Sequence, residues 1–371
     1  MNYYELICFS ILLLYIATVI SFTIGFFNLS TFFPSKNNPS NNNLKLSVLI
    51  PFKNEELNLP TIFQNLKNQN LNLDLFEVIF INDHSEDNSE IVLRNLINKE
   101  SNFKLISSKS KKSGKKEALK EGVKNAVNKL IVTTDADCIQ PETWLQTIYD
   151  FYLQHNPKMI IAPVIMKGTG FFGKLQALEF LSLTASTAGA AGLHKAIMCN
   201  GANLAFSKSV FNEFEDALNM NEISGDDVFL LHSVKKKYPK DIHYLKSNDA
   251  KVTTDSEKSL KYFLRQRIRW ASKSSSYRDF DTITISLIIF ITNLLLVLSS
   301  IILILIPEKI LFISSLFIGK MIIDSVLLIS AANYFKQIKL LFFIPILSII
   351  YPFYIVITAF SGLLTKQIKW K

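Results

Sequence analysis

Cysteine is scarce in this chain: Cys8, Cys138 and Cys199 are the only three among 371 residues. Their number is odd and their spacing fits no cysteine-based metal site, so the sequence does not predict a disulfide framework or a cysteine-rich metal centre. Free thiols of this kind are typical of proteins in a reducing compartment.

Acidic residues are also fewer than basic ones, 31 against 40, which gives a formal net charge of +9 and a pI near 9.2. No nucleic-acid-binding module accompanies this positive charge. Many lysines and arginines lie beside hydrophobic segments, where the cytoplasmic flanks of membrane helices and anionic lipids explain them. We therefore expect no nucleic-acid partner.

The features of a cleavable signal peptide are lacking as well. The chain begins Met-Asn-Tyr-Tyr-Glu without a basic segment, and no small-residue cleavage site follows the apolar run from Leu6 to Phe27. That run is long enough for a helix across a bilayer core, which takes about 20 residues. We expect a retained transmembrane anchor.

Apolar residues, in contrast, make up 49% of the chain, and its mean hydropathy of +0.24 is high for a purely soluble protein. Three further apolar stretches fill the C-terminal quarter, from Ile283 to Ile306, from Ile310 to Ala332 and from Leu340 to Leu364. We expect one N-terminal and about three C-terminal transmembrane helices in a multi-pass protein of the inner or plasma membrane.

The topology of the C-terminal part stays open at this level. If all four segments span, both termini lie on the non-cytoplasmic side, because the basic region from Pro34 to Asp281 should face the cytoplasm. The basic end from Lys366 to Lys371 argues against that placement. The last stretch carries Pro345 and Pro352, so a broken, re-entrant or interfacial segment is the alternative.

Lys320 and Asp324 are four residues apart within the second C-terminal stretch and would share a helix face. Ionisable residues inside a membrane segment are candidates for a functional role. A structural pair that neutralises its own charge is the other interpretation.

Between the anchors, short β-branched runs alternate with stretches of helical periodicity. The predicted strands are Leu46 to Pro51, Phe76 to Ile81 and Leu130 to Thr134, and the predicted helices include Leu57 to Gln69 and Ser89 to Asn98. This alternation predicts an α/β domain with a parallel sheet. We expect an anchor at 1–33, a linker at 34–44, a cytoplasmic catalytic domain at 45–281 and a membrane region at 282–371.

Polar residues follow each predicted strand directly, at Lys53 to Glu55, at Asn82 to Asp83 and at Asp135 to Asp137. Open α/β sheets bind ligands at the carboxyl ends of their strands, so these residues predict one cleft. Asp135 and Asp137 suit a divalent cation bound to diphosphate oxygens, although an isolated Asp-x-Asp also occurs in surface turns.

Two later motifs have structural alternatives when taken alone. Asp226 and Asp227 follow a predicted turn and can start a helix as an N-cap with a solvated neighbour. Gln266, Arg269 and Trp270 fall within one helical turn, which also describes a basic juxtamembrane helix with an interfacial tryptophan.

In order and combination these segments resemble the family 2 glycosyltransferases with a GT-A fold, a Rossmann-like nucleotide-sugar-binding domain. The similarity is to the membrane-integrated branch that contains cellulose, hyaluronan and poly-N-acetylglucosamine synthases, and it covers Lys45 to Ser274. Its motifs are Ile50-Pro-Phe-Lys-Asn-Glu-Glu56, Ile81-Asn-Asp-His-Ser-Glu-Asp87, Lys112-Ser-Gly-Lys-Lys-Glu-Ala-Leu119, Asp135-Ala-Asp137, Gly201-Ala-Asn-Leu-Ala-Phe206, Gly225-Asp-Asp227 and Gln266-x-x-Arg-Trp270.

The resemblance implies a set of residues around the nucleotide-sugar donor. Pro51, Lys53, Glu55 and Asp83 would line the nucleotide pocket, with Asp83 hydrogen-bonded to the base. Lys115 would approach the nucleotide or its phosphates.

It also implies the residues of the chemical step. Asp135 and Asp137 would bring Mg²⁺ or Mn²⁺ to the donor diphosphate, and Asp227 would be the general base of an inverting transfer. Asp226 stands where the family usually has Glu, which leaves its participation open. The residues implied in acceptor or phosphate binding are Asn203, in the floor beneath the acceptor, Asp226, Gln266, Arg269 and Trp270.

Three functions follow from this resemblance. The first is a synthase that extends a polysaccharide from a UDP-sugar, with membrane lipids and envelope export proteins as partners. The second is a transferase that adds one or a few sugars to a lipid, similar to ceramide or diacylglycerol glucosyltransferases. The third, a non-catalytic membrane assembly subunit, is disfavoured because none of the expected carboxylates is missing.

Overall fold

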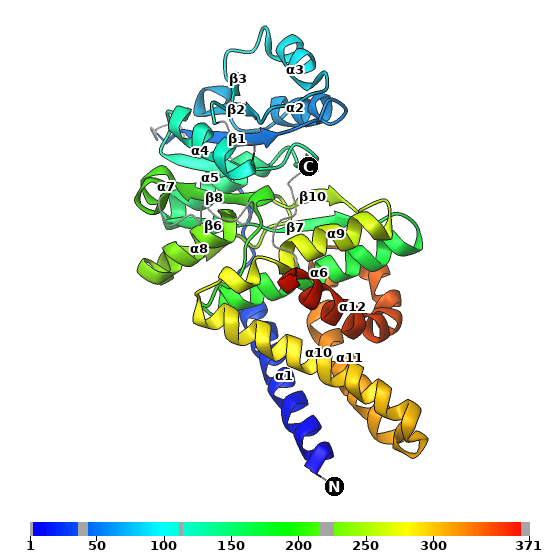
Figure 1. Cartoon of the computed structure of the whole chain (residues 1–371). Helices are drawn as coiled ribbons and strands as arrows, with labels where there is room; N and C mark the ends of the chain where they lie inside the picture. The colour runs from blue at the N-terminus through cyan, green and yellow to red at the C-terminus, as the bar shows by residue number, and fades with distance from the viewer. Residues whose placement is uncertain (1–2, 36–43, 111–113, 216–225, 365–371) are drawn as a thin grey trace. The chain divides into compact units, whose positions relative to one another are not determined.

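The computed structural model describes residues 3–35, 44–110, 114–215 and 226–364 (Figure 1). The chain forms two compact units. The helical unit contains the residues up to Asn28, residues 166–197 and the residues from Ser256 onward, and the sheet unit contains the stretches between them. The predicted turn before Asp226, most of the linker and the basic C-terminal end lie outside the described residues.

The sheet unit is built on a seven-stranded sheet with the order β3-β2-β1-β4-β8-β6-β9. The strands are β1 (Leu46–Phe52), β2 (Phe76–Asn82), β3 (Phe103–Ser107), β4 (Leu130–Thr133), β6 (Met159–Ile161), β8 (Leu204–Ser207) and β9 (Ile242–Tyr244). The three strands predicted from the sequence are confirmed, and every residue of β1, β2 and β4 is buried. Both faces of this part of the sheet are therefore covered, as in parallel α/β sheets.

The expected parallel arrangement holds for β3, β2, β1 and β4 but not for the whole sheet. β8 runs antiparallel to β4 and to β6. The reason lies in the turn before β8, because the Thr133 hydroxyl at the end of β4 donates to the carbonyl oxygen of Gly201 at 2.7 Å. β8 thus starts where β4 ends and returns in the opposite direction.

Helices and a small second sheet complete this unit. The helices are α2 (Leu59–Lys67), α3 (Ser89–Ile97), α4 (Lys115–Asn125), α5 (Trp144–His155), α7 (Lys208–Phe214) and α8 (Asp226–Lys237). Short 3-10 turns lie at Leu73–Leu75, Gly201–Asn203 and Pro239–Asp241, and β5 (Cys138–Ile139), β10 (Val252–Asp255) and β7 (Val164–Lys167) form a sheet of order β5-β10-β7. α2 shows why such segments become helical: Pro60 suits the first turn, and Leu59, Ile62, Phe63 and Leu66 form one buried stripe.

The helical unit contains α1 (Tyr3–Asn28), α6 (Gly170–Gly192), α9 (Leu260–Ala271), α10 (Phe280–Leu305), α11 (Ile310–Tyr334) and α12 (Ile344–Leu364), with 3-10 turns at Ser274–Ser276, Pro307–Lys309 and Ile338–Phe343. Four segments are long and apolar enough to cross a membrane: Tyr3–Asn28, Phe280–Leu305, Pro307–Tyr334 and Ile338–Leu364. The apolar segments expected from the sequence are therefore confirmed as helices.

The two prolines of the last segment do not break the helix. α12 continues through Pro352, and Pro345 lies in its first turn, where no backbone N–H is needed. A 3-10 turn at Ile338–Phe343 precedes the helix.

Lys320 and Asp324 form the ion pair that their spacing predicts, with Nζ and Oδ2 2.5 Å apart. The Tyr15 hydroxyl of α1 donates to Asp324 Oδ1 at 2.6 Å. The Lys320 ammonium also lies 5.0 Å from the centre of the Tyr15 ring and 5.0 Å from that of Tyr351. These contacts favour the structural interpretation, because they join α1, α11 and α12 within the apolar bundle.

Candidate active site

The loops that follow β1 and β2 are fastened to each other. The backbone N–H of Asn54 donates to Ser85 Oγ at 3.0 Å, and Asn54 Oδ1 accepts from the N–H of Glu86 at 2.8 Å. The N–H of Glu55 donates to Ser89 Oγ at 2.8 Å. These bonds fix two loops at the carboxyl edge of the sheet, where α/β proteins bind ligands.

Pro51 and Asp83 lie at this edge. Pro51 is in register with Ile81 on the neighbouring strand. Asp83 is fully buried, its N–H donates to the carbonyl oxygen of Phe52 at 2.8 Å, and its Oδ1 lies 3.2 Å from His84 Nδ1. The structure thus brings two of the predicted nucleotide-binding residues to adjacent strand ends.

Glu55 and Lys53 occupy the loop after β1. The Glu55 side chain is buried, and its Oε2 accepts from Asn58 Nδ2 at 2.6 Å. The Glu55 carbonyl oxygen also accepts from the backbone N–H groups of Asn58 and Leu59. Glu55 therefore organises the start of α2, whereas Lys53 is half-exposed at the rim.

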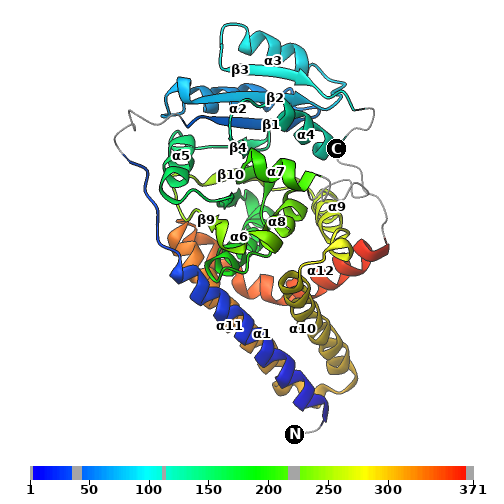
Figure 2. The ribbon, with the colours of Figure 1, turned by 90° about the vertical axis from the view of Figure 1, so that its left-hand side faces the viewer.

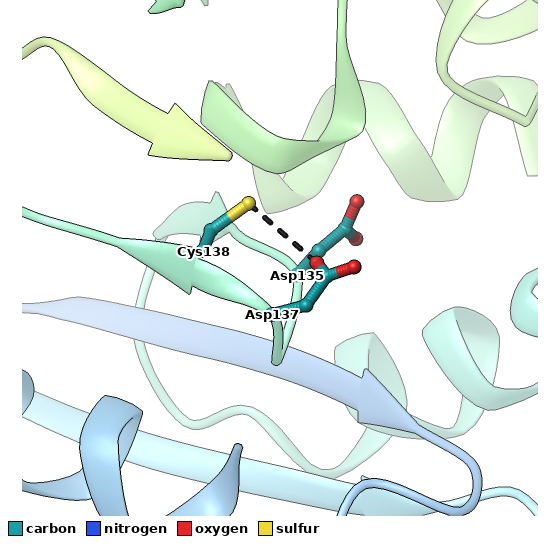
Figure 3. A group of neighbouring side chains, drawn as sticks. All are labelled: Asp135, Asp137 and Cys138. Atoms are coloured by element: carbon teal, nitrogen blue, oxygen red, sulfur yellow. Dashed lines mark hydrogen bonds between the residues drawn. The ribbon is translucent and has the colours of Figure 1, made fainter. Parts of the chain in front are cut away.

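Asp135 and Asp137 follow β4 and lie next to Cys138. One ligand atom from each of the three residues lies within 4.8 Å of the others (Figure 3). The Cys138 thiol donates to Asp137 Oδ1 across 3.7 Å. Burial raises the pKa of this thiol, and the charges of Asp137 and Asp135 raise it further. The protonated thiol therefore orients a carboxylate, and the carboxylate oxygens fit a hard cation such as Mg²⁺ or Mn²⁺.

Lys115, the first residue of α4, forms an ion pair with Asp135. Burial alone would lower the pKa of its ammonium group, but Asp135, Asp226 and Asp227 outweigh burial and raise that pKa above its ordinary value. A permanent positive charge therefore lies among three carboxylates.

Asp227 is held in place by two backbone hydrogen bonds. The N–H of Gly201 donates to its Oδ2 and the N–H of Val228 donates to its Oδ1, each at 2.9 Å. A Cβ placed on Gly201 would lie 3.5 Å from both Asp227 Oδ2 and Lys115 Nζ, so the turn at Gly201 borders both groups. Asp226 beside it is buried at the start of α8, as the helix-start interpretation predicts.

Asn203 is fully buried beneath the same turn. Its Nδ2 donates to the carbonyl oxygens of Pro163 at 2.8 Å and Ala250 at 2.7 Å, and its Oδ1 accepts from Trp144 Nε1 at 2.9 Å. All of these partners are protein groups. Asn203 therefore holds the turn to the segments before β7 and β10 and to α5.

The sequence of this unit matches a known family. Residues 47–214 match the family model described as glycosyl transferase family 2. The chain carries a family 2 glycosyltransferase domain. Among curated protein sequences, none matches this glycosyltransferase.

Several solved structures are similar to this chain. The mannosyltransferase PcManGT from Pyrobaculum calidifontis, in complex with GDP-Man and Mn²⁺, is similar with a TM-score of 0.56 at 14% identity, over 92% of this chain and 95% of that one. TarS 1-349 from S. aureus gives 0.46 at 14% identity, over 86% and 92% of the two chains. Glucosyl-3-phosphoglycerate synthase from M. tuberculosis gives 0.46 at 16% identity, over 65% and 85%. The likeness to PcManGT identifies the GT-A fold.

Gln266, Arg269 and Trp270 belong to the helical unit, on α9. Arg267, which the sequence-based predictions did not include, contacts two of these side chains. Its Nη1 donates to Gln266 Oε1 at 2.6 Å, and its guanidinium stacks 4.2 Å from the centre of the Trp270 ring. Its Nη2 pairs with Glu179 Oε2 of α6 at 2.5 Å, and both side chains are buried.

The predictions did not include Glu179, Arg267 or Cys138, and for Glu179 and Cys138 the sequence does hold a signal. Glu179 is a lone carboxylate in the apolar stretch from Gly170 to Gly192, and a buried charge of this kind needs a partner. Arg267 lies inside the Gln-x-x-Arg-Trp motif at a position that the motif leaves unspecified. Cys138 follows the Asp-x-Asp directly, so its thiol was bound to lie near the carboxylates.

Replacing Lys115 by Ala removes the cation that the three carboxylates surround. We expect binding of the nucleoside diphosphate product to weaken by about 2 kcal/mol, or roughly thirtyfold, since a charged hydrogen bond is lost. Isothermal titration of UDP and GDP into the purified protein with Mg²⁺ measures this change. Lys124→Ala, an exposed position on the same helix, is the matched control. Unchanged affinity in Lys115→Ala would exclude a contact with phosphate.

Breaking the Arg267 pair should destabilise the helical unit. Arg267→Met leaves the Glu179 carboxylate buried without its partner, at a cost of about 3–5 kcal/mol, and the double variant Arg267→Met, Glu179→Leu should recover most of that loss. Thermal unfolding of the detergent-solubilised protein gives the comparison, with Arg265→Met at an exposed position of α9 as the control. Losses that simply add in the double variant would contradict a coupled pair.

Proposed function

We propose that this family 2 glycosyltransferase transfers a sugar from a UDP-sugar to an acceptor hydroxyl with inversion, at the cytoplasmic face of the membrane. The observation that carries the proposal is the convergence of Lys115, Asp135 and Asp227 around the turn at Gly201. A single displacement at the anomeric carbon needs a base on the acceptor side and a charge sink on the side of the leaving group. This cluster offers both.

In this proposal, Pro51, Lys53, Glu55 and Asp83 shape the nucleotide site. The Asp83 carboxylate, directly after β2 at the carboxyl edge of the sheet, is the group proposed to accept a hydrogen bond from the base. The hydrogen bonds between the loops after β1 and β2 keep the site in place before the donor arrives, which lowers the ordering cost of binding.

Asp135 and Asp137 are the residues proposed to hold a divalent cation, Mg²⁺ or Mn²⁺. Such a cation, when bound, neutralises charge that develops on the departing diphosphate. Lys115 adds a second positive charge beside Asp135. PcManGT, with the same fold, was solved with GDP-Man and Mn²⁺, which supports a nucleotide-sugar and a divalent ion as ligands here.

Asp227 is the proposed general base. Its two backbone hydrogen bonds leave further lone pairs on each oxygen, so it can take the proton of an acceptor hydroxyl. Asn203 keeps the floor of the turn rigid, and Asp226 lies in the same first turn of α8. Gln266, Arg269 and Trp270 are proposed to contact the acceptor or the donor phosphates from α9.

The acceptor that the Gln-x-x-Arg-Trp motif favours is a growing polysaccharide. In that case residues 45–281 form the cytoplasmic catalytic domain. This domain is held at the membrane by the anchor at 1–33, with its linker at 34–44, and by the region at 282–371.

A lipid acceptor that receives one or a few sugars is the second candidate, and the packing of the helical unit favours it. Cys8 and Leu12 of α1 meet Leu296 of α10 and Leu316 of α11 in one buried apolar cluster. Side chains rather than a polar passage fill this part of the bundle.

Asp227→Asn should lower the transfer rate by about 10² to 10⁴-fold, because the amide cannot accept the proton. Asp137→Asn and addition of a chelator should each abolish activity that Mg²⁺ or Mn²⁺ supports. Release of nucleoside diphosphate from a panel of UDP- and GDP-sugars measures all three, with the exposed Asp74→Asn as the control. Full product formation in cells carrying both carboxylate variants would point to a non-catalytic assembly subunit.

The size of the product separates the two acceptors. A polysaccharide synthase should yield high-molecular-weight material that glycosidases degrade, whereas a lipid transferase should yield a glycolipid that organic solvent extracts. Membranes that contain the enzyme and a radiolabelled donor supply both fractions. A retained anomeric configuration in either product would refute the single displacement.

A further inference from the structure

Three helices of the helical unit run side by side along their length. At one end, the hydroxyl oxygens of Tyr4 and Ser299 are 2.7 Å apart, and Glu5 pairs with Lys309 at 2.5 Å. At the other end, the ring of Phe26 lies 6.1 Å from that of Tyr334. α1 is thus parallel to α11 and antiparallel to α10. We call the end with Glu5 and Lys309 the far end and the other the near end.

Both ends of α12 contact elements of the near end. Phe343, just before α12, lies 5.6 Å from Phe171 at the start of α6. α6 itself packs on the last turns of α1, since a Cβ on Gly189 would come within 2.3 Å of the Phe22 carbonyl oxygen. At the C-terminal side, a Cβ on Gly362 would come within 2.9 Å of Ala271, the last residue of α9. A helix with both ends on one side does not cross.

α12 also runs alongside α9 in the same direction. The rings of Phe263 and Tyr354 are 5.4 Å apart, and eight residues further along both helices Ala271 meets Gly362. α9 carries Lys261, Arg265, Arg267 and Arg269 within its twelve residues. Each such charge costs roughly 3 kcal/mol at the centre of a bilayer, so α9 belongs to the interface and holds α12 beside it.

The position of α12 along the bundle agrees with this placement. α12 meets α10 at Phe290, whose ring lies 5.8 Å from that of Phe360, and the remainder of α10 toward the far end is about 22 Å long. The hydrocarbon core is about 30 Å thick, so this contact places the C-terminal part of α12 in the leaflet of the near end. Figure 2 shows α12 lying crosswise to α1 and α10.

The outward residues of α12 form one apolar face. They recur at helical spacing, and each is exposed: Ile349, Ile350, Phe353, Ile357 and Leu364. We propose that α12 lies flat in the near-end leaflet with this face against the lipid acyl chains, so that the chain crosses the membrane three times instead of four.

This placement has a consequence for topology that does not depend on the enzymatic reaction. The chain leaves α1, enters and leaves α6, and enters α9 at the near end, so every connection to the sheet unit starts there. The last turn of α12 then lies on the same side of the membrane as these connections, opposite the start of α1. The positive-inside rule agrees with this placement, because the sequence that follows α12 is basic.

Cysteine labelling in intact cells tests the side of the C-terminus. Cys8, Cys138 and Cys199 are first replaced by Ala in the full chain, and single cysteines are then introduced as Glu308→Cys at the far end, Ser274→Cys after α9, and Lys371→Cys. We expect a membrane-impermeant maleimide to label Glu308→Cys in intact cells, and the other two only after permeabilisation. Labelling of Lys371→Cys in intact cells would overturn the proposal.

Nitroxide depth measurements in vesicles of phosphatidylethanolamine and phosphatidylglycerol test the orientation directly. The α12 series is Ile350→Cys, Ile357→Cys and Leu364→Cys, and the control series on α10 is Leu287→Cys, Leu298→Cys and Leu305→Cys, all at outward positions. A flat α12 predicts equal depths in its series, while the α10 depths change stepwise. A change of about 20 Å along the α12 series would show that it spans and would overturn the proposal.

Discussion

Backbone pairing of β1 with its two parallel neighbours fixes where the reactive side chains of the sheet unit can lie. The register sets Phe52 opposite Asn82 and Leu49 opposite Thr133. Because parallel strands end at one edge, the residues that follow them must share that edge. Asp83 and Asp135, more than fifty residues apart in sequence, follow the two strands on either side of β1 for this reason.

The negative charges of the carboxylates near that edge of the sheet have to be offset by a positive charge. Asp135, Asp226 and Asp227 would repel one another in a partly buried place, and Lys115 offsets their repulsion from the first turn of α4. The ammonium group of Lys115 therefore prevents these side chains from forming a cluster of uncompensated negative charge. The same electrostatic balance thus stabilises the fold and prepares the proposed chemistry.

The helical unit also pairs its buried charges, here among apolar side chains. Arg267 and Glu179 are buried together, and Trp270 covers the guanidinium. Lys320 and Asp324 neutralise each other beside Tyr15. Paired charges of this kind give little net stability, but an unpaired one is costly, so they restrict how α6, α9, α11 and α12 can pack.

The sequence by itself determined part of the elements and their order. Alternating β-branched runs predicted β1, β2 and β4, and the long apolar runs predicted the four membrane-type helices, because both signals are local and repeat with the period of the backbone. The positions of the carboxylates after each strand followed from the same pattern. Tertiary structure alone decided the direction of β8, the partner of Arg267, the burial of Asn203 and the course of α12 beside α9. Each of these depends on contacts between segments distant in sequence, and no local period encodes such contacts.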